Sequence, residues 1–318
     1  MNLGELQGLA ERIRTEIAVA VHGQEEVVEL LLVGMLARGH CLIEGPPGTA
    51  KTLLAQSLAA AVRLEFGRIQ FTPDLMPGDV LGANIFDFRE SAFHLVKGPI
   101  FTEILLADEI NRAPPKTQAA LLQAMQERVA TIDGVDHQLG ENFFVVATQN
   151  PIEQQGTYPL PEAQLDRFLF KIAVRFPAEA AELEILRRHA ALPLDHAAHG
   201  AGVMPAVTRE ELAAARALID GVRLDDSILA YALTLARATR SDNEILQGAS
   251  TRAADSLCAA VRALAALEGR DYAIPDDVKR LYPPVMRHRI VLAATAEIEG
   301  RTADDVLANI VNQVEAPK

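Results

Sequence analysis

The chain has 318 residues, of which 49% are apolar and 23% charged, with 43 acidic side chains against 30 basic ones. This length favours two domains, and the apolar fraction excludes a wholly disordered chain. The net charge of −13 argues against nonspecific binding to nucleic acids or anionic membranes. No run is apolar for long enough to insert into a membrane, and the first residues lack the basic start and apolar core of a signal peptide. These features predict a cytoplasmic protein.

The first 177 residues predict alternating helices and strands. Apolar residues at helical spacing predict helices over 3–21, 27–38, 52–62 and 115–128. Short apolar runs predict buried strands over 40–44, 66–71, 104–107, 143–147 and 172–176. Strands separated by helices indicate an α/β fold with a parallel five-stranded sheet.

Two segments interrupt this alternation and are predicted to be insertions. Residues 74–99 are rich in proline and glycine, with extended pieces at 83–88 and 92–96. Residues 129–139 carry a hairpin signal, with Asp133-Gly134 between alternating residues.

The composition changes after Pro177. Residues 191–207, with two prolines, two glycines and two histidines, are predicted to be a linker. The chain after Thr208 is alanine-rich and helical in pattern, and Pro275 with the two acids that follow it marks a helix start. We therefore expect an α/β domain over 1–190 and an all-helical domain over 208–318.

The two cysteines, Cys41 and Cys258, lie far apart in the sequence. Cys41 falls in an apolar, strand-like run and Cys258 in an alanine-rich helical run. Both are predicted to be small buried residues of a reducing compartment, and neither a disulfide nor a zinc site is indicated.

A glycine- and proline-rich segment joins the strand at 40–44 to the helix at 52–62. In that context, backbone N–H groups of the loop and the helix start bind phosphate, Lys51 reaches the outer phosphates and Thr52 holds Mg²⁺. Ala50 stands where the strict motif has glycine, and its methyl group is tolerated if that residue is already helical. An ordinary strand-to-helix turn is the alternative, and the Lys-Thr pair between strand and helix argues against it. The predicted nucleotide-binding residues are Gly45, Pro46, Pro47, Gly48, Thr49, Ala50, Lys51, Thr52 and Leu53.

Two further strands end in polar residues. Asp108 and Glu109 follow the apolar run 104–107, at the sheet edge where ligands bind in open α/β folds. Asp108 is predicted to hold the Mg²⁺ shell, and Glu109 to polarise an attacking water. Asn150 follows the strand at 143–147 and is expected beside the γ-phosphate, where a neutral amide orients water. Taken alone, the acids could form a solvated turn and Asn150-Pro151 a common strand terminator.

Two arginines are candidates for contacting a bound nucleotide. Arg167 follows a short helix predicted over 161–168, and it either pairs with Asp166 on its own surface or reaches a neighbour's nucleotide. Arg252 opens a helix of the second domain, and it either bridges that domain to the phosphates or is a solvated surface residue.

These residues resemble those of AAA+ ATPases, and specifically of the MoxR family, over nearly the whole chain. The phosphate loop corresponds to Walker A and 105–109 to Walker B, while Asn150 matches sensor 1, Arg167 the arginine finger and Arg252 sensor 2. Alanine before the lysine is usual in that family. The strings that carry the resemblance to MoxR proteins are 108–116, 149–153 and 157–163.

The resemblance also places the two insertions and the adenine site. Residues 74–99 are similar to the insert in helix 2 of this clade, and 129–139 to its hairpin before sensor 1. The segment that covers the adenine ring in such ATPases is matched by Val21, His22, Gly23 and Gln24.

The family implies an ATP-driven, Mg²⁺-dependent ring, usually a hexamer, with each active site between two subunits. MoxR proteins are thought to act as chaperones that mature enzyme complexes or insert metal cofactors, often with a partner that carries a von Willebrand factor A domain. The client protein or metalloenzyme is not identified by the sequence. The alternatives are a metal-chelatase motor subunit of the same clade, a nucleotide-gated scaffold without turnover, and a DNA helicase, which the net charge disfavours.

Overall fold

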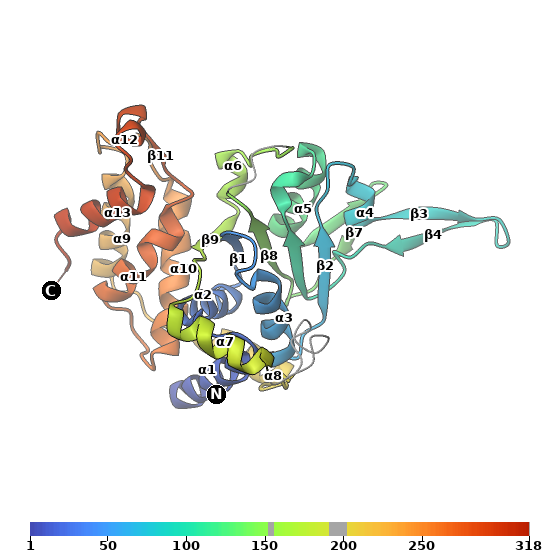
Figure 1. The fold of residues 1–318 in the computed structure, drawn as a ribbon, viewed down its shortest axis with the longest axis horizontal. Coiled ribbons are helices and arrows are strands. Elements are labelled where there is room, and N and C mark those ends of the chain that lie inside the picture. Colours follow the sequence, from blue (N-terminus) through green and yellow to red (C-terminus); the bar gives the residue numbers. More distant parts are fainter. Residues whose placement is uncertain (152–155, 191–201, 318) are drawn as a thin grey trace.

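A five-stranded parallel sheet forms the centre of the molecule, as the sequence predicts. The computed structural model describes residues 1–151, 156–190 and 202–317 (Figure 1). The strands lie in the order β2-β5-β8-β1-β9, and each neighbouring pair is parallel. Their bounds are β1 (His40–Glu44), β2 (Phe66–Gln70), β5 (Ile104–Asp108), β8 (Phe144–Gln149) and β9 (Phe168–Ala173).

Helices cover both faces of this sheet, which explains why its strands are apolar throughout. Successive side chains of a strand point to opposite faces. In β1, Cys41 and Ile43 therefore join one apolar cluster and Leu42 joins the other. The first cluster includes α1 (Leu3–Ala20), α2 (Glu25–Leu36) and α3 (Lys51–Ala61), and the second α4 (Pro77–Leu81) and α5 (Pro115–Glu127).

A fifth strand is present, but its predicted limits of 172–176 are wrong. β9 begins at Phe168, because the preceding helix α6 (Glu162–Leu165) ends earlier than the predicted 161–168. The side chains of Phe168 and Phe170 are buried on opposite faces of the sheet, whereas that of Phe176 is 62% exposed. Burial of the two phenylalanines thus decides which part of this apolar stretch pairs with β1.

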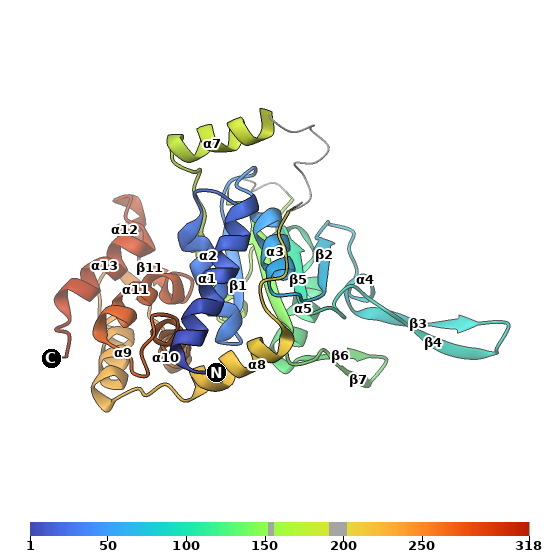
Figure 2. The ribbon, with the colours of Figure 1, turned by 90° about the horizontal axis from the view of Figure 1, so that it is seen from below.

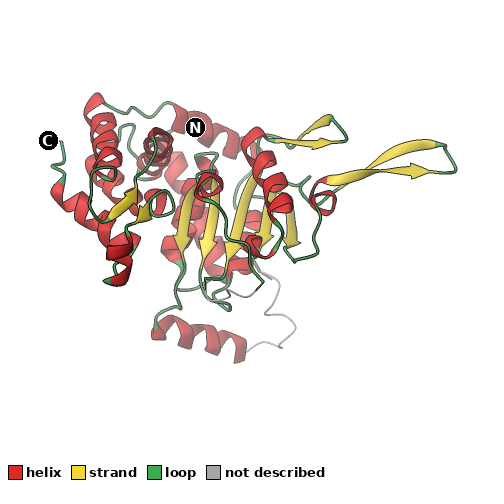
Figure 3. Cartoon of the chain, turned by 90° about the horizontal axis from the view of Figure 1, so that it is seen from above, coloured by secondary structure: helices red, strands yellow, loops and turns green. Residues whose placement is uncertain are grey.

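Both predicted insertions form antiparallel hairpins that extend from the body (Figure 3). The longer one pairs β3 (Gly82–Asp87) with β4 (Ala92–Lys97) and carries exposed aromatic side chains, Phe88 at its turn and Phe93. The shorter one pairs β6 (Val129–Ile132) with β7 (Val135–Gln138). Its turn residues Asp133 and Gly134 both have positive φ, as the Asp-Gly signal predicts.

The C-terminal part is helical, with one addition to the predicted all-helical domain. Two short strands, separated in sequence by α10 and α11, pair antiparallel within it. The elements are α8 (Arg209–Asp220), α9 (Asp226–Ala238), β10 (Ile245–Gln247), α10 (Thr251–Leu267), α11 (Pro275–Met286), β11 (Val291–Leu292), α12 (Ala294–Ile298) and α13 (Ala303–Gln313). Figure 2 shows α7 (Glu179–Ala190), which precedes them, apart from α9 to α13.

Residues 191–201 of the predicted linker lie outside the described residues. The part that follows is packed: Val203 and Val207 are buried, and the Ala206 N–H donates to the Ala61 carbonyl at the end of α3 at 2.8 Å. Apolar residues of α10 join the same cluster as those of α1 and α2. In this conformation one continuous core therefore links the C-terminal helices to one face of the sheet, and the domain limits of 190 and 208 stay predictions.

Two further expectations concern membranes and thiols. Among the described residues, no helix is long and apolar enough to cross a membrane. Both cysteines are free; Cys41 is buried as predicted, whereas Cys258 on α10 is only half-buried, which corrects that expectation. No group of residues suited to holding a metal by histidine, cysteine and acidic side chains was found in the part of the chain that the structure describes.

Candidate functional site

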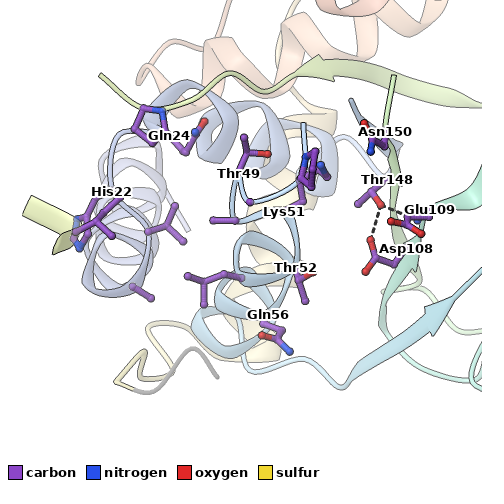
Figure 4. A pocket seen from close by; sticks show the side chains of 18 of the residues that line it. His22, Gln24, Thr49, Lys51, Thr52, Gln56, Asp108, Glu109, Thr148 and Asn150 are labelled. Carbon is purple, nitrogen blue, oxygen red and sulfur yellow. Dashed lines mark hydrogen bonds between the residues drawn. The ribbon is translucent and has the colours of Figure 1, made fainter. Parts of the chain in front are cut away.

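The residues predicted to bind nucleotide meet because three neighbouring strands end at one edge of the sheet. β5, β8 and β1 are adjacent, and the segments after them carry the two acids, Asn150 and the phosphate loop. A pocket of about 500 Å³ lies there (Figure 4), and Pro177 and Ile185, before and on α7, also contribute to its wall. The predicted residues that line it are Val21, His22, Gln24, Pro47, Gly48, Thr49, Ala50, Lys51, Thr52, Leu53, Asp108, Glu109 and Asn150.

Three of the predicted nucleotide-binding residues do not line this pocket. An added Cβ at Gly45 would lie 2.5 Å from the Val174 carbonyl, and one at Gly23 2.8 Å from Ala181 Cβ, so both glycines permit close packing. Pro46 stabilises the loop through its carbonyl, which accepts a hydrogen bond from the Thr49 hydroxyl at 2.9 Å.

The Lys51 ammonium is held at the inside of the loop. Its Nζ donates to the carbonyl oxygens of Gly45 at 2.7 Å and Pro46 at 2.8 Å. Burial lowers the pKa of Lys51, and the nearby carboxylates of Asp108 and Glu109 partly oppose this. A cation with reduced hydration that faces an open pocket binds an anion strongly.

Two pocket residues have a backbone conformation that is unusual for residues other than glycine. Ala50, the N-cap of α3, has φ 59° and ψ 25°, and Glu109 has φ 56° and ψ 51°. The condition under which the Ala50 methyl group was expected to be tolerated, a helical backbone, is therefore not met, because Ala50 is left-handed. Strained backbone of this kind concentrates at functional sites.

A buried hydroxyl joins the two acids. Thr148 on β8 is fully buried; its Oγ1 donates to Asp108 Oδ1 at 2.7 Å and accepts the Glu109 N–H at 2.9 Å (Figure 4). This pair of bonds fixes the Asp108 carboxylate and the strained Glu109 backbone relative to β8. Thr148 lines the pocket and was not predicted.

Side chains from the edge strand β2 contact the second Asp108 oxygen and one Glu109 oxygen. Arg68 donates to Asp108 Oδ2 at 2.7 Å, and Gln70 donates to Glu109 Oε2 at 2.9 Å. Arg112 also reaches Glu109 Oε2, at 3.2 Å. The alternation Arg68-x-Gln70 on a strand is a signal that puts two polar groups on one face, but only the register with β5 aims them at the acids. Other lining residues that sequence reasoning missed are Ala20, Gln56, Gln149, Pro177 and Ile185.

The two candidate arginines lie outside the pocket lining. Arg167 is half-buried between α6 and β9, and its guanidinium forms neither a hydrogen bond nor an ion pair with any described residue. The pairing of Asp166 with Arg167 is wrong, since the Asp166 carboxylate accepts from Arg289 instead, at 2.6 Å. Arg252 is exposed in the first turn of α10, after Ser250, which caps that helix.

Known proteins share the sequence pattern and the fold of this chain. Residues 40–170 match the family model described as the ATPase family associated with various cellular activities (AAA), and residues 237–310 match the AAA lid domain. The chain is 40% identical to Chaperone MoxR1 of Mycobacterium tuberculosis, over 99% of this chain and 86% of that protein. It is 30% identical to Protein MoxR of Methylorubrum extorquens, over 99% and 97%. A crystal structure of a candidate ATPase from Cytophaga hutchinsonii superposes with a TM-score of 0.90 at 38% identity, covering 99% of this chain and 97% of that one.

Proposed function

Because the chain belongs to the MoxR family of AAA+ ATPases, we propose that it hydrolyses ATP to ADP and phosphate in the pocket described above. The observation that supports this most directly is that Lys51, Thr52, Asp108, Glu109 and Asn150 line one pocket. A cation, two carboxylates, a hydroxyl and an amide at the end of a parallel sheet are the set of groups that phosphoryl transfer to water requires.

The same pocket fits a magnesium ion. Mg²⁺ prefers hard oxygen ligands and retains several waters, so it needs one or two protein oxygens and the phosphates of the nucleotide. The Thr52 hydroxyl and the Asp108 carboxylate both line the pocket. We propose that these two residues hold Mg²⁺, which would neutralise charge on the phosphate oxygens.

We propose that three further residues of the pocket act on the attacking water and on the phosphates. Glu109 takes a proton from the attacking water, and its carboxylate is oriented for this by Gln70 and Arg112. Asn150, which is 8% exposed and lines the pocket, orients that water through its amide. Lys51 exchanges the two loop carbonyls for phosphate oxygens when ATP binds.

The active site is proposed to be completed by a second subunit of a homo-oligomeric ring, most simply a hexamer. Arg167 lies outside the pocket of its own chain and makes no ion pair with a described residue, which leaves its guanidinium available to a neighbour. An arginine supplied in trans stabilises charge on the transferred phosphoryl group and is worth about 10³–10⁵ in rate. Arg252 is proposed to bridge the lid to the phosphates when the lid closes.

In the cell, we propose a chaperone role in maturing a protein complex or inserting a metal cofactor. One relative is named a chaperone and several are MoxR proteins. A partner with a von Willebrand factor A domain and a cytoplasmic location belong to this proposal, as does a client that is a protein complex or metalloenzyme. A metal-chelatase-like motor subunit is the alternative within the same clade.

Mixing two inactive variants tests whether the protein hydrolyses ATP and whether Arg167 acts in the pocket of the adjacent subunit. Glu109→Gln removes the base of its own pocket and leaves Arg167 intact, whereas Arg167→Ala does the reverse. Each variant alone is expected to bind ATP and release no phosphate. In mixed rings, an intact pocket meets an intact arginine at some interfaces, so phosphate release returns in part. Mixed rings that are seen by native mass spectrometry and stay inactive contradict the trans role of Arg167, and a wild-type protein without phosphate release contradicts the ATPase.

A further inference from the structure

The lid is anchored to the segment that carries Arg167 by one buried guanidinium. Arg289, between α11 and β11, has a side chain that is only 2% exposed. Its Nε donates to Asp166 Oδ1 at 2.6 Å and its Nη2 to the Phe168 carbonyl at 2.7 Å. Nη1 donates to the Leu169 carbonyl at 3.1 Å and also to the carbonyl of Val285.

A neighbouring histidine reinforces this anchor. Nε2 of His288 lies 3.0 Å from the Phe168 carbonyl, to which it donates, and the ring is buried. Burial and the adjacent Arg289 lower the pKa of His288 well below its usual value, so the ring is neutral near pH 7. The Phe168 carbonyl thus accepts from two lid residues.

These contacts enclose Arg167 on both sides along the chain. The residue before it gives a carboxylate to Arg289, and the residue after it gives a carbonyl to both Arg289 and His288. A guanidinium that is nearly fully desolvated is stable only while its charge and N–H groups are satisfied. The position of the Arg167 backbone is therefore tied to the position of the lid, and Figure 1 shows the lid helices α10 and α11 beside β9.

We infer that Arg289 is a positioning residue that couples the lid of one subunit to catalysis in the pocket of the next. This rests on the proposed function, because it requires that Arg167 acts in trans. When the lid moves in response to nucleotide in its own pocket, the Arg289–Asp166 contact moves Arg167 relative to the neighbour's phosphates. Misplacing a catalytic group by about 1 Å costs roughly 10²-fold in rate.

The test uses Arg289→Lys in the full-length protein, with Asp166→Asn as a second variant in case the first does not fold. Lysine keeps the charge near Asp166 and cannot reach the set of carbonyls that the guanidinium fork binds. We expect kcat to fall roughly 10- to 100-fold. The KM for ATP is expected to stay within about twofold, because Arg289 does not line the pocket.

A matched control is Arg270→Lys. Arg270 forms a comparably close ion pair within the lid, to Asp277 at 2.6 Å, and makes no hydrogen bond to the described part of the Arg167 segment. It is expected to lower the melting temperature as Arg289→Lys does and to keep its kcat. An equal loss of kcat in both variants would assign the effect to general loosening of the lid and overturn the proposal.

Mixed rings locate the defect. If Arg289 positions Arg167, Arg289→Lys subunits regain activity with Glu109→Gln subunits and not with Arg167→Ala subunits. If Arg289 instead serves its own pocket, the pattern is reversed, and if neither mixture recovers, the contact serves assembly; both results overturn the proposal. The Glu109→Gln and Arg167→Ala mixture is run in parallel. If that mixture stays inactive, Arg167 does not act in trans, and the proposed coupling between the lid and the neighbouring pocket is wrong as well.

Discussion

Thr148 offers a stringent test of how the acidic end of β5 is held. Replacing it with valine keeps the shape of the side chain and removes the hydroxyl that contacts Asp108 Oδ1 at 2.7 Å and the Glu109 N–H at 2.9 Å.

The cost follows from two separate losses. A hydrogen bond to a charged group contributes about 1.5–3 kcal/mol, and a buried N–H without an acceptor costs about 1–3 kcal/mol. Water in the adjoining pocket compensates part of the second loss, so we expect Thr148→Val to lower the free energy of unfolding by about 2–4 kcal/mol. Thr148→Ser keeps both bonds and removes one methyl group, which costs about 1 kcal/mol.

Urea denaturation measures these differences as a shift of the midpoint at an unchanged slope. Steady-state phosphate release then tests the catalytic consequence. Thr148→Val frees Glu109 from its strained backbone conformation, so kcat is expected to fall at least about tenfold, while Thr148→Ser stays within about threefold. Equal stability of the two variants, or equal kcat, would show that the hydroxyl does not hold the two acids.

The remaining predictions concern one backbone position and one buried ring. Ala50→Gly is expected to leave the free energy of unfolding unchanged or to raise it by up to about 1 kcal/mol. The left-handed backbone of Ala50 costs about 1–2 kcal/mol, which glycine avoids. The greater entropy of glycine in the unfolded chain offsets part of that gain. Ala50→Val, measured by the same urea titration, should destabilise the protein, and if valine is tolerated as well as glycine the residue is not left-handed. His40 is buried, accepts the Val145 N–H at Nδ1 and donates from Nε2 to the Met125 carbonyl, and burial lowers its pKa from 6.5 to about 4. As the pH falls, His40 is protonated in the unfolded chain before it is protonated in the folded protein. The stability that neutral His40 gives above pH 6.5 is therefore lost as the pH falls toward 4, and the loss is roughly 3 kcal/mol. Unfolding free energies at several pH values for the wild type and His40→Gln check this, and an equal pH slope in both would refute it.

Much of the candidate site follows from sequence order alone. A buried strand, a glycine turn and Lys51-Thr52 at a helix start fix the phosphate loop locally, because the strand and helix are consecutive. Asp108, Glu109 and Asn150 end apolar strands, and the carboxyl ends of parallel strands share one edge of the sheet. These residues line the pocket as expected.

Long-range packing determined the rest. The strand order places β5 and β8 side by side, which lets Thr148 bridge the two acids, and no sequence pattern distinguishes that hydroxyl from any other buried threonine. The pairing of Asp166 with Arg289 joins residues 123 positions apart, whereas the sequence offered the adjacent Arg167. Local signals specify backbone geometry within a few residues, while the partners of a buried charge depend on which distant elements the apolar core brings together. The sequence by itself therefore determined which polar side chains meet at this pocket, and the tertiary structure decided which other side chains hold them in place.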